Sequence, residues 1–330
     1  MSADAISTGS HRGGQEASSC LTQQGCAVIT NGLTRRFGRK LALDGVSARV
    51  PVGSIYGLMG PNGAGKTTFI RCLLNLMNPT SGSGMVLGHD IVRDSVAVRR
   101  QVGHVAALQP LWEWMTVREL ASFMAGCYPK WNQDAVKAVL APVGIDLNDK
   151  IQDLSRGQRT LAALAVAIGH EPELLLLDEA LTGLDPISRR EVLRNVIDVM
   201  HAENRTVLIT GQDIADMERI CDYVGFLIRG KLFWESTLDD LKARVKRIRV
   251  EHPDGPQPQV PESALRVERA PRETEFTVVD FARDLVASLA APGRRVEIID
   301  LSLEDIFVDL AQPQLTNAGP GAEAPVKVPA

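Results

Sequence analysis

The sequence has few cysteines, and their spacing suits neither a disulfide framework nor a metal site. Five occur in 330 residues, at Cys20, Cys26, Cys72, Cys127 and Cys221. No Cys-x-x-Cys pair is present, and no second pair accompanies Cys20 and Cys26, as a zinc site would require. This scattered usage favours a chain kept reduced in the cytosol over a secreted, disulfide-linked one.

A basic surplus and a long hydrophobic run are also missing. The chain carries 36 Lys and Arg against 40 Asp and Glu, a net charge of −4, which gives no overall electrostatic reason to expect nucleic acid binding. Apolar stretches such as 161–168 and 174–177 are far shorter than the ~20 residues that a membrane-spanning helix needs. We therefore expect a protein that binds no nucleic acid and does not cross a membrane by itself.

Both ends of the chain have the composition of disordered tails. Residues 1–26 are rich in Ser, Gly, Gln and Thr and lack the apolar core of a secretory signal. Residues 312–330 are dominated by Pro, Ala, Gly and polar residues. The whole chain is 45% hydrophobic and 23% charged, which is typical of a soluble globular protein, and its length fits one large and one small domain.

Residues 27–237 alternate short β-rich runs with helical patterns. The predicted strands are 28–30, 54–59, 102–105, 174–177, 206–209 and 224–228. The predicted helices are 117–126, 134–140, 157–169, 188–201 and 213–220. Several strands are apolar without alternation, as expected when both faces of a sheet are covered. The sequence therefore predicts an α/β domain with a largely parallel sheet, whose phosphate-binding loops lie at the carboxyl ends of the strands.

Residues 238–311 have a different character and predict a small α+β domain. Alternating strands are expected at 248–251, 275–279 and 295–299, and helices at 280–290 and 302–310. The last helix begins with a Ser302-Leu303-Glu304-Asp305 sequence that resembles a helix cap. This domain contains no chemical motif.

The most informative stretch is Gly60-Pro61-Asn62-Gly63-Ala64-Gly65-Lys66-Thr67-Thr68. It fits the pattern Gly, four residues, Gly-Lys-Thr, placed between an apolar strand and a helix. Small residues let backbone N–H groups curl around a polyphosphate, and the helix start adds its positive dipole end. Lys66 can then reach the β- and γ-phosphates while the Thr67 hydroxyl ligates Mg²⁺. The alternative, a glycine-rich turn that binds nothing, is disfavoured by the full match in this context.

Two further segments extend this chemistry. The apolar strand 174–177 ends in Asp178 and Glu179; Asp178 is placed to hold Mg²⁺, and Glu179 to polarise an attacking water. The segment Leu154-Ser155-Arg156-Gly157-Gln158 opens a helix, where Ser155 is a plausible N-cap and Gly157 lets the backbone approach a phosphate. A charged strand end and a simple cap are the alternatives.

At these residues the chain resembles the nucleotide-binding subunit of an ATP-binding-cassette (ABC) transporter. Residues 60–68 match Walker A, 154–158 the signature motif, 174–179 Walker B and Leu181–Asp185 the D-loop. Phe37 matches the aromatic residue that stacks on adenine. Residues 301–307 resemble the end of cassettes that serve drug- or polysaccharide-type exporters. The resemblance implies a P-loop NTPase cassette with an antiparallel β subdomain and a helical subdomain.

The resemblance also implies a mechanism. Two cassettes close head to tail, and each ATP lies between one Walker A and the partner's signature helix. The residues expected to bind MgATP are Phe37, Gly60, Pro61, Asn62, Gly63, Ala64, Gly65, Lys66, Thr67, Thr68, Ser155, Gly157, Gln158 and Asp178. Thr67 and Asp178 would hold Mg²⁺, and Glu179 and Gln212 would be catalytic. The partners are a second cassette and a separate transmembrane permease, which places the chain on the cytoplasmic face of the cell membrane.

Two positions depart from the family pattern. Ala107 stands where the family has a Gln, with Gln109 two positions on, and Gln212 stands where a His reaches the γ-phosphate. A Gln can orient a water. Glu179 could therefore drive a slower hydrolysis assisted by Gln212, or the chain could bind ATP and hydrolyse it poorly, so that closure is the useful event. The intact Asp178-Glu179 pair favours the first hypothesis.

Two questions stay open. The segment Leu111–Val117, with Trp112 and Trp114, could be core or could form a docking patch for the permease. A soluble ABC protein acting on ribosomes or DNA is a further alternative. Such proteins usually carry two cassettes or a long coiled-coil insertion, and this sequence shows neither.

Overall fold

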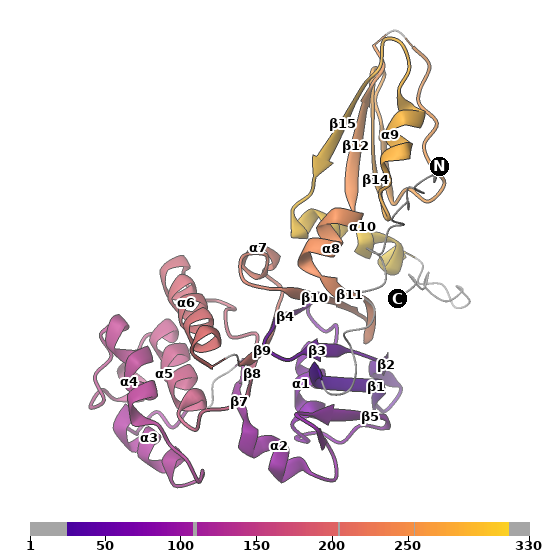
Figure 1. The fold of residues 1–330 in the computed structure, drawn as a ribbon. Coiled ribbons are helices and arrows are strands. Elements are labelled where there is room, and N and C mark those ends of the chain that lie inside the picture. The colour runs from indigo at the N-terminus through magenta and orange to yellow at the C-terminus, as the bar shows by residue number, and fades with distance from the viewer. Residues whose placement is uncertain (1–24, 108–110, 204, 254, 317–330) are drawn as a thin grey trace, which may run out of the picture.

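The computed structural model describes residues 25–107, 111–203, 205–253 and 255–316. Gln109 and most of the two predicted tails lie outside these residues. The described part is α/β, as predicted, and contains a mainly parallel sheet, an antiparallel sheet and a smaller C-terminal sheet (Figure 1). Within this part, no helix combines the length and apolar character needed to cross a bilayer.

The central sheet has six strands in the order β11-β10-β4-β9-β8-β7. Its members are β4 (Ile55–Met59), β7 (Val102–Val105), β8 (Leu174–Asp178), β9 (Thr206–Gly211), β10 (Tyr223–Ile228) and β11 (Lys231–Thr237). Five of them pair in parallel and β11 adds an antiparallel edge. The five parallel strands agree with the prediction, whereas β11 lacked a clear sequence signal.

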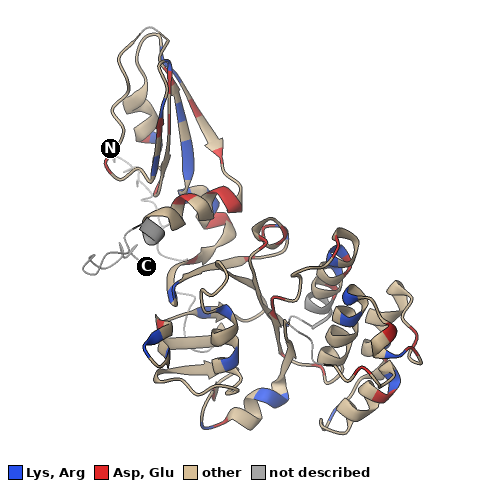
Figure 2. Cartoon of the chain, turned by 180° about the vertical axis from the view of Figure 1, so that it is seen from behind, with Lys and Arg blue, Asp and Glu red and all other residues tan. Residues whose placement is uncertain are grey.

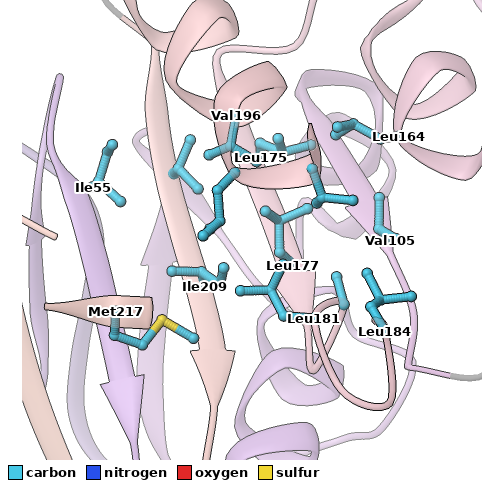
Figure 3. Packing of buried hydrophobic residues seen from close by; sticks show 14 of the residues in the cluster. Ile55, Val105, Leu164, Leu175, Leu177, Leu181, Leu184, Val196, Ile209 and Met217 are labelled. Atoms are coloured by element: carbon cyan, nitrogen blue, oxygen red, sulfur yellow. The ribbon is translucent and has the colours of Figure 1, made fainter. Parts of the chain in front are cut away.

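Strand β8 shows why its sequence carries no polar alternation. Leu174 and Leu176 are buried in one apolar cluster and Leu175 and Leu177 in another, on opposite faces of the sheet. Figure 3 shows the second cluster, where Leu177 lies beside Ile209 of β9 and Leu181. Because successive strand residues point to opposite faces, a strand covered on both sides must be apolar throughout.

Helices pack on both faces of this sheet. They are α1 (Lys66–Leu73), α2 (Ser95–Gln101), α3 (Val117–Ala125), α4 (Gln133–Leu140), α5 (Arg156–Ile168), α6 (Pro186–Glu203) and α7 (Ile214–Met217). Helices α3 to α6 each begin and end within two residues of the predicted bounds. Helix α7 is shorter than the predicted 213–220 because its last turn gives way to the chain that leads into β10.

An antiparallel sheet packs on the face of the central sheet that Leu174 and Leu176 occupy, together with α1 and α2. It is ordered β2-β1-β5-β6, with β3 also paired to β1. The strands are β1 (Cys26–Phe37), β2 (Lys40–Val46), β3 (Arg49–Pro51), β5 (Ser81–Val86) and β6 (His89–Asp90). The antiparallel subdomain itself was expected from the resemblance, but only residues 28–30 were predicted as a strand, because β2, β3, β5 and β6 are short or rich in Gly and polar residues.

The C-terminal sheet is antiparallel and ordered β13-β14-β12-β15. Its elements are β12 (Lys246–Glu251), β13 (Arg266–Arg269), β14 (Glu273–Val278), α9 (Arg283–Leu289) and β15 (Arg295–Asp300). Ile248, Val250 and Phe276 are buried in a separate small core. This sheet agrees with the predicted α+β pattern; β13 is an additional strand.

Two helices join this sheet to the rest of the molecule. They are α8 (Leu238–Arg244) and α10 (Leu303–Thr316). Helix α10 begins as predicted, since the Asp305 N–H donates to the Ser302 hydroxyl at 3.1 Å, but it extends six residues beyond the predicted end at 310. Leu303 and Ile306 belong to the large apolar cluster of the central sheet, and Phe307 packs edge-on against Phe226 of β10.

Basic and acidic residues are interspersed over the molecule rather than gathered on one face (Figure 2). On β12 the register places Arg249 opposite Glu275 of β14 and Glu297 of β15, and its guanidinium lies 2.5 and 3.4 Å from those carboxylates. Lys246 is likewise paired with Asp300. The basic side chains of residues 242–249 are therefore largely neutralised by acidic partners.

Candidate functional site

The glycine-rich loop 60–65 connects the end of β4 to the start of α1, in the strand–loop–helix context that the sequence predicted. Gly63 and Gly65 have φ values of 78° and 115°, in the left-handed region that L-residues with a Cβ avoid. A Cβ on Gly60 would overlap the carbonyl oxygen of Leu227, and one on Gly65 that of Ala42. The tight curvature of this loop therefore requires glycine at these positions.

Lys66 is the first residue of α1, and its side chain folds back over the loop. Its ammonium donates to the carbonyl oxygens of Gly60 at 2.8 Å and Pro61 at 3.2 Å. It also lies 3.2 Å from Oε1 of Glu179, and only 2% of its side chain is exposed. A buried ammonium needs partners for its three protons, and here the loop and Glu179 supply them.

The next residue, Thr67, meets Asp178 from the end of β8. The Thr67 hydroxyl donates to Asp178 Oδ1 at 3.0 Å, although 111 residues separate the two. Thr210, at the end of β9, donates to the same oxygen at 3.1 Å. A hydroxyl beside a buried carboxylate is a set of hard oxygen donors of the kind that Mg²⁺ prefers.

This donor set is sparse. Within the part of the chain that the structure describes, no group of three or more His, Cys, Asp or Glu side chains could hold a metal ion. Mg²⁺ is commonly held by one or two protein oxygens together with substrate phosphates. The arrangement fits a magnesium ion that arrives with a nucleotide better than one held by the protein alone.

Glu179 follows Asp178 in an unusual backbone conformation. Its φ is 49°, in the left-handed region, where a residue other than glycine is strained by about 1–2 kcal/mol. Two contacts fix it there, because its N–H lies 3.1 Å from the Thr210 hydroxyl and 3.2 Å from the Thr210 carbonyl. The turn directs its carboxylate to Lys66 instead of continuing the strand.

The segment 154–158 forms a capped helix start, as the sequence predicted for Ser155. The Gln158 N–H donates to the Ser155 hydroxyl at 3.2 Å, and the Ser155 N–H donates to Gln158 Oε1 at 3.0 Å. Ser155 is exposed and Gly157 is buried against Ser188, whose side chain a Cβ on Gly157 would overlap. The start of α5 is therefore exposed at Ser155 and packed closely against the start of α6 at Gly157.

Gln212 borders a cavity of about 330 Å³ beside the loop that follows β8. The lining residues are Leu181, Thr182, Gly183, Arg189, Thr210, Gly211, Gln212, Asp213, Ile214, Met217 and Glu304. The lining does not include Lys66, Thr67 or Asp178. Thr210 connects the cavity to these residues, because it lines the cavity and its hydroxyl donates a hydrogen bond to Asp178. The cavity is therefore contiguous with the loop site without containing it.

Arg189 of α6 crosses this region and pairs with two carboxylates. Its guanidinium donates to Asp213 and, at 2.7 Å, to Asp216. Burial acts against its charge, but the hydrogen bonds and charges of Asp216 and Asp213 outweigh it and raise the pKa of Arg189 above its ordinary value. Sequence patterns did not identify this triad, because its members come from separate helices.

The position expected to carry the family glutamine is occupied by Ala107, a half-buried residue in the turn after β7. Gln109 lies outside the described residues. His104 in β7 is largely buried, and burial lowers its pKa while the Asp178 charge acts in the opposite direction. Because alanine has no amide group, residue 107 supplies no side-chain amide to the site.

Phe37 lies at the end of β1 and is 43% exposed, which leaves a ring face available for stacking. The Arg35 guanidinium lies over this ring, 4.8 Å from its centroid, and also donates to the Asn78 carbonyl at 2.6 Å. Sequence reasoning singled out Phe37 but not Arg35, whose contact depends on the pleat of the strand.

Trp112 and Trp114 are both exposed, at 42% and 67%. Trp112 packs edge-on against Phe123 of α3, which is itself half exposed, with ring centroids 4.9 Å apart. Within this segment, Val117 is buried in the core, and Leu111 and Met115 pack against it while partly exposed. The alternative that this segment buries both tryptophan side chains in the core is therefore wrong.

The sequence and fold are similar to a well-defined group of proteins. The family described as ABC transporter matches residues 43–182. The bacitracin transport ATP-binding protein BcrA of Bacillus licheniformis is 34% identical over 222 residues, which cover 67% of this chain and 72% of that protein. The daunorubicin resistance ATP-binding protein DrrA3 of Streptomyces coeruleorubidus is 35% identical over 230 residues, covering 68% and 72%.

A solved structure shows the same fold. The ATP-binding subunit of an ABC transporter superposes with a TM-score of 0.59 at 25% sequence identity, over 66% of this chain and 92% of that one. The matched share of this chain is about the size of the predicted large domain.

Proposed function

Because this chain belongs to the ABC transporter family of ATP-binding subunits, we propose that it binds MgATP and hydrolyses it to ADP and phosphate. The energy released would drive a separate membrane-spanning subunit. The observation that carries this proposal is the meeting of Lys66, Thr67, Asp178 and Glu179 at one glycine-rich loop, with the Thr67 hydroxyl 3.0 Å from Asp178.

We assign nucleotide binding to the loop 60–65 and to the residues around it. The backbone amides of Gly60 to Gly65 and the ammonium of Lys66 face the phosphates, and Phe37 stacks on the adenine. Lys66 would exchange its carbonyl partners and Glu179 for phosphate oxygens. Thr67 and Asp178 would hold Mg²⁺, which when bound neutralises charge on the phosphates.

We assign hydrolysis to Glu179 and Gln212. Glu179 accepts a proton from the attacking water, and its strained backbone aims the carboxylate toward the loop. Gln212 keeps an amide that can orient this water, although it lacks the charge of a protonated histidine. With Ala107 offering no amide, we expect hydrolysis to be slower than in cassettes with the full residue set.

The exposed start of α5 supports a head-to-tail dimer. Ser155, Gly157 and Gln158 would contact the γ-phosphate of the nucleotide held by the partner cassette. The partner is a second cassette, either identical or related. ATP then binds the two cassettes together, and hydrolysis releases them.

The exposed pair Trp112 and Trp114 supports contact with a membrane subunit. Neighbouring exposed aromatic residues are typical of protein interfaces. We place the docking patch there, and the chain on the inner, cytoplasmic face of the membrane that holds this subunit.

We divide the chain into a cassette that ends at residue 237 and a small domain that follows it. The predicted bounds of the tails, 1–26 and 312–330, need correction, because β1 begins at Cys26 and α10 continues to Thr316. The separate core of β12 and β14 supports the small domain, whereas Leu241 of α8 and Ile306 of α10 are buried with the cassette. The two helices therefore serve as anchors of the small sheet on the cassette.

The second candidate function is an ATP-gated module that hydrolyses poorly, and Ala107 and Gln212 are the observations that favour it. Steady-state ATP turnover of the wild type, Glu179→Gln and Gln212→His separates the two. We expect measurable wild-type turnover, loss of at least about a hundredfold in Glu179→Gln, and a gain in Gln212→His. Equal, background-level rates in all three would remove the hydrolysis claim.

Size-exclusion chromatography of the same proteins tests the dimer. Glu179→Gln with MgATP should elute as a dimer, because closure without hydrolysis is not reversed, whereas Lys66→Ala should stay monomeric. Co-purification of a membrane protein from detergent-solubilised membranes would support the transporter assignment, and capture of ribosomes or DNA instead would support a soluble ABC protein.

A further inference from the structure

Gln212 lies in a very short connection between two elements. Strand β9 ends at Gly211 and helix α7 begins at Ile214, so Gln212 and Asp213 are the whole loop. A Cβ on Gly211 would overlap the Met217 side chain, so α7 packs closely against the end of the strand. The direction of the Gln212 side chain therefore depends on what holds α7 and Asp213 in place.

Asp213 occupies the N-cap position of α7 but makes no side-chain cap hydrogen bond. A capping aspartate commonly stabilises a helix by about 1 kcal/mol. Instead, its carboxylate pairs with Arg189, which also binds Asp216 one turn into the same helix at 2.7 Å. One guanidinium thus holds both the loop that carries Gln212 and the helix that follows it.

Arg189 is itself tied to the loop 181–185. Helix α6 begins at Pro186, and Asp185 caps it by accepting the N–H groups of Ile187 and Ser188 at 3.0 and 3.1 Å. The Arg189 N–H donates to the Asp185 carbonyl at 3.0 Å, so Arg189 lies in the first turn of α6. The cavity beside Gln212 is lined from this loop by Leu181, Thr182 and Gly183.

We propose that Arg189 is a positioning residue that couples the loop 181–185 to Gln212. Its Nη1 nitrogen pairs with both Asp213 and Asp216, so a shift of the 181–185 loop is carried through Arg189 to the residues that follow β9. The inference rests on the proposed hydrolysis and deepens it: Arg189 acts through Gln212 and does not touch the nucleotide.

Five single variants and one double variant test this role by ATP turnover and by ATP affinity in equilibrium binding. Arg189→Ala should lower kcat by about tenfold to a hundredfold, because small misplacements of a catalytic group cost that much, with ATP affinity unchanged. Asp213→Asn and Asp216→Asn should each give a part of this loss. Arg190→Ala, the exposed neighbour on the same helix, is the matched control and should behave as the wild type.

The decisive comparison is Arg189→Ala made in a Gln212→Ala background. If Arg189 works through Gln212, the two losses are not additive and the double variant turns over ATP as slowly as Gln212→Ala alone. Additive losses, or an Arg189→Ala protein with wild-type kcat, would overturn the inference. If Arg189→Ala fails to fold, the milder Asp213→Asn carries the same comparison.

The failure of the proposed function looks different. Background turnover in the wild-type protein would remove the hydrolysis claim and this inference with it. Wild-type turnover with equal rates in Arg189→Ala and Arg190→Ala would remove the inference alone.

Discussion

The ammonium nitrogen of Lys66 lies 3.2 Å from Oε1 of Glu179, so the proposed phosphate-binding cation and the proposed water-activating carboxylate are paired with each other. Each compensates the charge of the other in a site where an unpaired ion is costly. Under the proposed function, nucleotide phosphates would compete with Glu179 for Lys66. Binding of ATP would therefore free the glutamate at the moment when a water needs to be activated.

Replacing Lys66 by Met should abolish this pairing and weaken ATP binding by at least about tenfold, since a charge-assisted contact to phosphate is lost. Isothermal titration calorimetry with MgATP measures the change. Arg71→Gln, an exposed cation on the same helix, is the control and should bind ATP normally. Equal affinities for the two variants would contradict the role given to Lys66.

Replacing Leu177 by Ala should lower the free energy of unfolding by about 2–5 kcal/mol, because a large cavity would open between β8 and the packed helices. Urea denaturation followed by circular dichroism measures this loss. Ile298→Ala, at a side chain that is 44% exposed on β15, should change stability by no more than about 0.5 kcal/mol. A Leu177→Ala protein as stable as this control would show that the cluster is loosely packed.

His170 makes stability depend on pH. Burial lowers its pKa from 6.5 to about 4, and its ring stacks on Tyr128 at 3.9 Å. Between these pH values the unfolded chain binds a proton that the folded protein does not. The free energy of unfolding should therefore fall as the pH is lowered from 6.5 to 4.

Urea midpoints at several pH values check this dependence in the wild type and in His170→Gln. The variant should lose part of the slope between pH 6.5 and 4. His89→Gln, which removes a half-buried imidazole elsewhere, controls for a general effect of losing a histidine. A slope that His170→Gln leaves unchanged would assign the acid sensitivity to other groups.

Replacing Trp114 by Ala should weaken association with the membrane subunit by at least about tenfold and leave ATP affinity unchanged, because exposed tryptophans often dominate an interface. Pull-down from solubilised membranes and nucleotide titration measure the two properties. Ile298→Ala supplies the control for loss of an exposed apolar side chain. Normal capture of the membrane subunit by Trp114→Ala would exclude this patch from the interface.

Much of the site could be predicted because it depends on local pattern. The spacing of Gly60, Gly65 and Lys66 defines a phosphate loop, and the end of an apolar strand at Asp178 brings a carboxylate to the same edge of a parallel sheet. The meeting of Thr67 and Asp178 follows from these two facts. The functional roles of these residues stay predictions until nucleotide binding is measured.

The remaining contacts depend on tertiary structure. Thr210 joins the site because β9 pairs beside β8, and Arg189 reaches Asp213 because its side chain extends from the first turn of α6 to the loop before α7; neither residue stands in a distinctive motif. Strand β5, with the sequence Ser-Gly-Ser-Gly-Met-Val, gains its structure from pairing with β1 rather than from β propensity. The left-handed turn at Glu179 is likewise imposed by its contacts with Thr210.

The return of helix α10 to the central sheet has a consequence for biosynthesis. Domains generally fold from the N-terminus as the chain leaves the ribosome. Here Leu303 and Ile306 complete the interior formed by residues synthesised far earlier, such as Phe226. This part of the interior is therefore complete only after translation passes residue 306, and we expect a polypeptide truncated after residue 237 to expose the apolar surface that Leu303 and Ile306 cover.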